Sequence, residues 1–143
     1  MSNGRVALVT GSATGIGRTT ALELAKNGYD VVINYSRSEG PAREAVAEAQ
    51  AAGAKALLVK ADVSQDSEVR AMLKAVEDTF GRLDALVNVA GTTVLTVQED
   101  LEAISPEDFD RIMAVNVKGT FLATRAAAPL LKRTGNAAVV NLA

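Results

Sequence analysis

Short apolar runs alternate with amphipathic stretches along this chain, about every fifteen residues. Apolar runs bounded by turn residues are typical of strands buried on both faces, and apolar residues at helical spacing are typical of helices packed on them. Such alternation favours parallel pairing through right-handed crossovers. The pattern therefore predicts a single α/β domain over residues 1–143, a doubly wound parallel sheet with helices on both faces. The predicted strands are 6–9, 31–33, 56–59, 83–87 and 137–143.

Start and stop signals place the helices of the first part of the chain. The first helix follows Gly17 and ends at Asn27-Gly28, where glycine permits a left-handed stop. The second covers 41–52, and a third runs to Phe80 with its start capped by the side chain of Ser64. Neither repeats nor linkers indicate a second domain.

The last third of the chain departs from simple alternation. Ser105 and Pro106 combine an N-cap with a proline at the first helical position, so a helix begins there. Its pattern continues to Arg133, with a kink expected near 116–119. From Phe121 to Leu131 the helix is apolar nearly all round, and such a helix is buried on more than one side. We therefore expect this stretch to need a partner beyond its own sheet.

The turn after the first apolar run is rich in glycine. Glycine permits a tight turn without a Cβ clash, and it lets backbone N–H groups and the positive end of the next helix approach a phosphate. The stretch therefore predicts an anion-binding turn; the alternative is a glycine-rich turn that binds nothing. Its spacing is neither G-x-G-x-x-G nor G-x-x-x-x-G-K-[ST], which disfavours a nucleoside triphosphate P-loop. The predicted anion-binding residues are Gly11, Ser12, Thr14, Gly15, Ile16 and Gly17.

The composition removes several kinds of chemistry. The chain has no cysteine and no histidine, which excludes disulfides, thiolate nucleophiles, metal sites built on either residue and Ser-His-Asp catalysis, and we predict no metal site. A formal net charge of −2 with both signs mixed, and few aromatic residues, argue against a nucleic-acid partner. Without a signal-peptide pattern or a membrane-spanning apolar stretch, the sequence predicts a cytoplasmic protein with no membrane partner.

Five motifs in a fixed order give the chain a family resemblance. They are Thr10-Gly11-x-x-x-Gly15-x-Gly17, Asp62, Asn88-Val89-Ala90-Gly91, Asn116 and Val139-Val140-Asn141-Leu142. Over essentially its whole length the chain resembles the short-chain dehydrogenase/reductase family, in particular its 3-oxoacyl reductases and glucose dehydrogenases. The resemblance implies a Rossmann-type fold, a nicotinamide dinucleotide cofactor, and hydride transfer between that cofactor and a small carbonyl or alcohol substrate.

The resemblance assigns roles to residues after the third strand and in the long helix. Asp62, followed by Val63, would bind the adenine ring of the cofactor, although the residue type alone equally allows Asp62 to cap the next helix. Asn116 would be a buried amide that supports a proton relay to the family's catalytic lysine, and it is the catalytic residue that we assign. The alternative is that Asn116 only marks a kink.

The end of the fourth strand carries a further part of the predicted cofactor site. Asn88, Ala90 and Gly91 stand at a strand end, where ligands bind in doubly wound sheets, against the alternative of a plain turn. Val89 departs from the family, which has a second asparagine at that position. The hydrogen bonds of that asparagine must therefore be lost here or made by the backbone.

The end of the second strand bears on the choice of cofactor. NAD-preferring members carry an acidic residue there that accepts hydrogen bonds from the ribose 2′-hydroxyl. This chain has Tyr35, followed by Ser36, Arg37 and Ser38, a set suited to a phosphate dianion. The resemblance therefore implies that NADP(H) is preferred and NAD(H) is possible, although Thr14 stands where many NADP-preferring members carry another arginine. The alternative is a solvated loop and acceptance of both cofactors.

The family's catalytic serine and its Tyr-x-x-x-Lys pair are not in this sequence, since Tyr29 and Tyr35 lie outside such a motif. We expect the chain to be the cofactor half of a longer enzyme, truncated after the fifth strand. The alternative is a catalytically incomplete nucleotide-binding or scaffolding module.

The long helix bears on assembly. Family members pair the helix that corresponds to 121–131 across a two-fold axis, so the resemblance implies a homodimer or homotetramer through this helix. A chain that ends at Ala143 would also leave its fifth strand as an open apolar edge.

Overall fold

The computed structural model describes residues 4–96 and 99–143. Within these residues a wholly parallel five-stranded sheet has the order β3-β2-β1-β4-β5. The chain winds outward from β1 to β3 and then crosses over to β4 on the other side of β1, which confirms the predicted doubly wound α/β fold. The strands are β1 (Arg5–Val9), β2 (Tyr29–Tyr35), β3 (Ala56–Lys60), β4 (Ala85–Asn88) and β5 (Ala138–Asn141).

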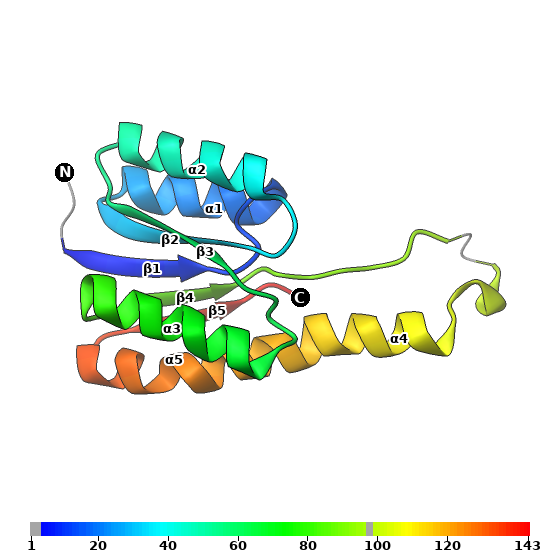
Figure 1. Ribbon diagram of the computed structural model, residues 1–143. Helices are drawn as coiled ribbons and strands as arrows, with labels where there is room; N and C mark the ends of the chain where they lie inside the picture. The colour runs from blue at the N-terminus through cyan, green and yellow to red at the C-terminus, as the bar shows by residue number, and fades with distance from the viewer. Residues whose placement is uncertain (1–3, 97–98) are drawn as a thin grey trace.

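Helices cover both faces of the sheet, as the sequence predicts. On one face lie α1 (Gly15–Lys26) and α2 (Glu39–Ala51), and on the other lie α3 (Asp66–Phe80) and α5 (Thr120–Thr134) (Figure 1). A further helix, α4 (Pro106–Met113), extends beyond the carboxyl ends of the strands (Figure 1). The arrangement is a three-layer α/β/α fold.

The strands are apolar because both of their faces are buried. In β1, Val6 and Leu8 belong to the core under α3 and α5, whereas Val9 belongs to the core under α1 and α2. In β2, Val32 belongs to the first of these cores and Ile33 to the second. Since successive side chains of a strand point to opposite faces, a continuous apolar run is what a strand covered on both faces requires.

Three helix starts differ from the sequence prediction, and the first is that of α1, which begins at Gly15 and not after Gly17. α2 begins at Glu39, ahead of Pro41, because proline is tolerated in the first turn of a helix. α3 begins at Asp66, and the predicted cap by Ser64 is wrong. The Ser64 hydroxyl instead donates a hydrogen bond to Oδ1 of Asp62 at 2.7 Å, so it stabilises the turn before the helix.

The long helical segment of the last third has an irregular middle. Its start is confirmed, since Ser105 Oγ accepts a hydrogen bond from the Asp108 N–H at 3.1 Å. Between α4 and α5, where the sequence predicts a kink, the chain forms a π-helical segment, η2 (Ala114–Gly119). A Cβ on Gly119 would lie 2.7 Å from Cγ2 of Val63. Glycine therefore allows this segment to pack directly on the loop after β3.

The exposed apolar surface of this helix lies earlier than the sequence predicts. Within the run 121–131, Leu122, Leu130 and Leu131 are buried in the core under α3 and α5, so they need no partner from another molecule. Burial of this run on more than one side is therefore confirmed for most of its length, with α3 and the sheet as its partners, and pairing of the run with a second copy stays a prediction. Exposed apolar side chains instead follow one another at four-residue spacing and form what we call the apolar stripe. Its members, 41–58% exposed, are Phe109, Met113, Val117 and Phe121.

A buried carboxylate joins the starts of β1 and β4. The Asp84 side chain is 5% exposed, and its Oδ2 accepts a hydrogen bond from the Val6 N–H at 2.8 Å. Both of its oxygens accept hydrogen bonds from Arg82, and its backbone carbonyl accepts one from Ala138 of β5. Burial by itself would raise the pKa of Asp84, but the Arg82 guanidinium and the Val6 N–H hold this pKa below its ordinary value.

We predict that Asp84→Asn lowers the free energy of unfolding by about 1–2 kcal/mol near neutral pH, because it removes the charge-assisted bonds with Arg82. A carboxylate whose pKa is lowered by folding stabilises the protein above its ordinary pKa of about 4, and this contribution is lost as the pH falls through the folded-state pKa. The difference between wild type and variant should therefore shrink at acidic pH.

Urea titrations of the protein that contains this chain, from neutral pH down to about pH 3, measure this difference. Asp78→Asn is the matched control, because the Asp78 side chain is 60% exposed and pairs only at the surface with Lys74. A difference for Asp84→Asn that stays constant over the whole pH range would contradict the prediction.

Candidate functional site

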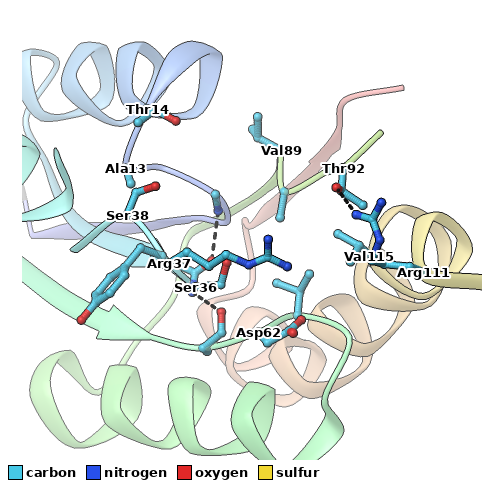
Figure 2. A pocket seen from close by; sticks show the side chains of 17 residues that line it. Ala13, Thr14, Ser36, Arg37, Ser38, Asp62, Val89, Thr92, Arg111 and Val115 are labelled. Carbon is cyan, nitrogen blue, oxygen red and sulfur yellow. Dashed lines mark hydrogen bonds between the residues drawn. The ribbon is translucent and has the colours of Figure 1, made fainter. Parts of the chain in front are cut away.

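The carboxyl ends of the parallel strands surround an open cavity of about 310 Å³. It lies where β1 and β4 neighbour each other while the helices that follow them cover opposite faces, which is the usual place for a ligand in a doubly wound sheet. Figure 2 shows the side chains around it. The predicted site residues that line it are Gly11, Thr14, Tyr35, Ser36, Arg37, Asp62, Val63, Ala90 and Gly91. Those outside the lining are Ser12, Gly15, Ile16, Gly17, Asn88 and Asn116.

The turn between β1 and α1 requires glycine at two points. Gly11 has a φ of +63°, and a Cβ there would lie 2.9 Å from the Cα of Ala90. A Cβ on Gly17 would lie 2.3 Å from the carbonyl oxygen of Gly11. The first turn of α1 therefore rests directly on the backbone of the turn. Gly17 lies outside the cavity, but it sets how closely the helix approaches it.

The N-terminus of α1 has the properties of an anion site. Thr14, its N-cap, has an extended backbone and makes no side-chain cap bond, and the first turn carries no acidic side chain. By contrast, α2, α3 and α4 each carry at least one acidic residue in the first turn. Backbone N–H groups at a helix start, together with the helix dipole, favour negative charge. Because Thr14 lines the cavity, an anion at this end would lie at the cavity's edge.

A buried amide fastens the turn to the sheet. Asn34 of β2 is 1% exposed; its Oδ1 accepts a hydrogen bond from the Gly11 N–H at 3.0 Å, and its Nδ2 donates one to the Ala61 carbonyl at 3.1 Å. The N–H of Ser12 donates to the Asn34 carbonyl, and its hydroxyl donates to the carbonyl of Val9. Both donors of Ser12 are thus used inside the protein, and contact of Ser12 with an anion stays a prediction.

The threonine at the end of β1 holds the end of β4. Thr10 Oγ1 accepts hydrogen bonds from the backbone N–H groups of Val89 at 3.0 Å and Ala90 at 3.1 Å. The Val89 side chain lines the cavity. These bonds come from the main chain and do not depend on the side chain at position 89, so both alternatives for the hydrogen bonds of the family's asparagine stay open.

The end of β2 presents a cation to the cavity. Tyr35 is buried, 8% exposed, whereas Ser36, Arg37 and Ser38 are exposed. The Arg37 side chain extends into the cavity, and within residues 4–96 and 99–143 it has neither an ion-pair nor a side-chain hydrogen-bond partner (Figure 2). A guanidinium that is not already paired, next to two hydroxyl groups, is well suited to bind a phosphate group.

The carboxylate after β3 closes a turn. Asp62 Oδ1 accepts hydrogen bonds from the Ser64 N–H at 2.9 Å and from the Ser64 hydroxyl at 2.7 Å. The N-cap of α3 is Gln65, so the alternative in which Asp62 caps this helix is wrong. Asp62 and Val63 both line the cavity, and contact of either with an adenine ring stays a prediction.

Two amides of the predicted site bind other parts of the protein. Asn88 Nδ2 donates to Asn141 of β5 at 2.8 Å and to Thr124 of α5 at 3.2 Å, while its Oδ1 is buried without a partner among the described residues. Asn116 is exposed, so the prediction that it is buried is wrong. Its amide pairs with Thr92, accepting from the N–H at 2.8 Å and donating to the carbonyl at 3.0 Å.

Several residues of the cavity are not predicted from the sequence. Arg111 of α4 and Thr92 line it on the side opposite Arg37, and Arg111 Nη1 donates to the Thr92 hydroxyl at 3.0 Å (Figure 2). Asn34 had a usable signal, because an amide inside an apolar strand must find buried partners. Arg111 had none, since an arginine on an amphipathic helix is ordinary.

The described residues offer neither a cluster of metal ligands nor a membrane-spanning helix. Across residues 4–96 and 99–143, no group of three or more acidic, histidine or cysteine side chains is placed to hold a metal ion. In the same part of the chain, no helix is both long and apolar enough to cross a membrane.

Known proteins resemble this chain over nearly its whole length. The family model for short chain dehydrogenases matches residues 5–143. A Streptomyces violaceoruber protein named as ketoacyl reductase 2 of the granaticin polyketide synthase is 46% identical over 137 residues, covering 96% of this chain and 53% of that protein. The 3-oxoacyl-[acyl-carrier-protein] reductase FabG of Staphylococcus aureus is 40% identical over 136 residues, covering 95% of this chain and 54% of that protein.

A solved structure supports the same grouping. A Burkholderia xenovorans protein assigned to the short-chain dehydrogenases/reductases matches with a TM-score of 0.90 at 37% identity. The match covers 94% of this chain and 55% of that chain. The chain thus spans about half the length of the relatives that it matches.

We predict that Gly17→Ala destabilises the protein more than Gly15→Ala does. At position 17 the added Cβ would lie 2.3 Å from the Gly11 carbonyl oxygen, a clash that only a shift of α1 relieves, and we expect a loss of about 3 kcal/mol or more. At position 15 the φ is +56° and no atom lies within 4 Å of the added Cβ, so the cost is backbone strain of about 1–2 kcal/mol. Urea unfolding measures both losses, and equal losses would contradict the reading of Gly17.

Proposed function

The chain belongs to the short-chain dehydrogenase family, and we propose that the protein containing it is an oxidoreductase that uses NADP(H) in preference to NAD(H). The proposal rests on Arg37, whose guanidinium reaches the cavity without a partner among the described residues. An acidic side chain at the end of β2 would repel a 2′-phosphate. This chain has the buried Tyr35 there instead, followed by Ser36 and Arg37.

The residues around the cavity fit the parts of a dinucleotide. Gly11 lets the turn after β1 lie directly against Ala90, and the start of α1 offers backbone N–H groups suited to a pyrophosphate. In this proposal Asp62 holds the adenine ring, while Ala90 and Gly91 hold the nicotinamide half. When bound, the nicotinamide supplies or accepts the hydride. Asn116 acts on the wall of the cavity through Thr92.

We propose a 3-oxoacyl group as the substrate, because two relatives are named as ketoacyl or 3-oxoacyl reductases. A sugar alcohol or aldehyde is the second candidate. The printed sequence holds no Tyr-x-x-x-Lys pair, so these 143 residues supply cofactor binding and not the family's proton transfer. Dinucleotide binding without carbonyl reduction by the whole protein would favour the alternative of a binding or scaffolding module.

We predict that Arg37→Ala weakens NADP(H) binding by about ten- to a hundredfold, the equivalent of one to two charge-assisted hydrogen bonds, and leaves NAD(H) binding within about twofold. Fluorescence titration of both reduced cofactors measures this. Arg43→Ala is the control, since the Arg43 side chain is 67% exposed and pairs with Glu39 on α2, outside the cavity. Equal affinities of the wild type for both cofactors, or an unchanged Arg37→Ala variant, would overturn the NADP(H) assignment.

We further propose a homodimer or homotetramer in which the apolar stripe of one subunit packs on that of a second copy. Two antiparallel copies related by a two-fold axis near residue 115 set Phe109 against Phe121 and Met113 against Val117. Asp110 and Lys118 border the same groove, and the same symmetry brings each close to the other in the second copy. The surface is therefore complementary to itself in both charge and apolar character.

We predict that Lys118→Asp weakens self-association about tenfold or more, because it places like charges opposite each other. Combining it with Asp110→Lys restores the opposite charges and should restore association. Sedimentation or light scattering across a concentration series measures both, with Lys132→Asp, an exposed position outside the groove, as control. Unchanged association of the single variant, or no recovery in the double variant, would refute this interface.

A further inference from the structure

Thr92 is held by side chains of α4 and η2, which lie about twenty residues further along the chain. It follows Gly91 in the segment that leaves β4, and it lines the cavity. Asn116 pairs with both its N–H and its carbonyl, at 2.8 and 3.0 Å. Arg111 donates to its hydroxyl at 3.0 Å. The backbone and the side chain of Thr92 are therefore fixed from different points on α4 and η2.

The guanidinium that holds Thr92 is itself held in place. Arg111 Nη2 donates to Asp108 Oδ1 at 3.2 Å, and Asp108 Oδ2 accepts a hydrogen bond from Ser105 Oγ at 3.1 Å. Arg111, and after it Ser105, hold the pKa of Asp108 below its ordinary value, so the Asp108 carboxylate stays ionised near neutral pH. A continuous chain of polar contacts runs from the N-cap of α4 to the wall of the cavity.

The segment that Thr92 belongs to depends on such contacts. Residues 89–96 form neither helix nor strand, so backbone ladders do not fix their position. Thr10 fixes the first part, through the N–H groups of Val89 and Ala90. Beyond Gly91, Asn116 and Arg111 provide the hydrogen bonds to Thr92. Asn116 thus fixes the Thr92 backbone at two points, and the bond from Arg111 adds a third point on the Thr92 side chain.

The two guanidinium groups of the cavity are used in different ways. Arg37 has no partner among the described residues, whereas Arg111 is committed to both Asp108 and Thr92. We propose that Arg111 is a positioning residue, which holds the Ala90–Thr92 backbone as the wall that receives the nicotinamide half of the dinucleotide. This inference rests on the proposed function. In it, Arg37 binds the 2′-phosphate directly, whereas Arg111 acts on the nicotinamide half only through Thr92.

Binding of NADPH and of 2′,5′-ADP to the protein that contains this chain tests the proposal, because 2′,5′-ADP lacks the nicotinamide half. We expect Arg111→Met to weaken NADPH binding about tenfold and to leave 2′,5′-ADP binding within about twofold. Thr92→Val should have a similar effect. The double variant should bind NADPH no more weakly than either single variant, since both substitutions remove the same hydrogen bond. Arg111→Lys should recover part of the loss, because an ammonium group still donates to the Thr92 hydroxyl.

Arg70→Met is the matched control, since Arg70 pairs with an aspartate one turn away on α3 and does not line the cavity. The proposal would be overturned if Arg111→Met bound NADPH as tightly as the wild type does, or if it lost the same affinity for both probes. Additive effects of Arg111→Met and Thr92→Val would mean that Arg111 contacts the ligand directly, which also overturns it. A wild type that binds neither probe would instead refute the proposed function.

Discussion

Loops that leave the carboxyl edge of this sheet must satisfy their backbone polar groups without filling the space above the strands. Buried N–H and carbonyl groups need partners, and here neighbouring side chains supply them. Asn34 holds the turn after β1, Thr10 holds the end of β4, and Asn116 holds Thr92. A helix or strand in place of these loops would fill the space above the carboxyl ends of the strands. Because single side chains make these bonds, the cavity stays open and its walls stay fixed.

Much of the fold could be predicted because it depends on periodicity and on glycine. A strand covered on both faces must be apolar throughout, and Gly17 must lack a Cβ where α1 meets the Gly11 carbonyl. Predictions from the sequence were wrong or incomplete where a residue contacts a partner that the sequence pattern does not identify. Ser64 has the right type to cap a helix, yet it bonds to Asp62. The apolar run 121–131 indicates burial but not that α3 and the sheet already provide it.

The site could be predicted where a residue acts through its own backbone or stands next to its partners in sequence. Arg37 lies between two serines, so the sequence alone marks it as a candidate, and it does line the cavity. Arg111 has the same chemistry, but its role depends on Thr92, which only the packing of α4 beside the β4 loop brings near. The number of arginines and the net charge are the same whether a guanidinium is free or committed. The role of Arg111 is therefore decided by tertiary contacts and is not encoded in a local motif.

The helix formed by α4, η2 and α5 serves two surfaces at once. Arg111 and Asn116 reach the segment that leaves β4, while Met113 and Val117 lie on the exposed apolar stripe. The π-helical turn between α4 and α5 has a wider repeat than an α-helix, and such turns are frequent at functional sites. If a second copy packs on the stripe as proposed, it contacts the same helical segment whose side chains hold Thr92. Assembly and the shape of the cavity wall then depend on one helix, so a change at the subunit interface acts on the cofactor site without touching it.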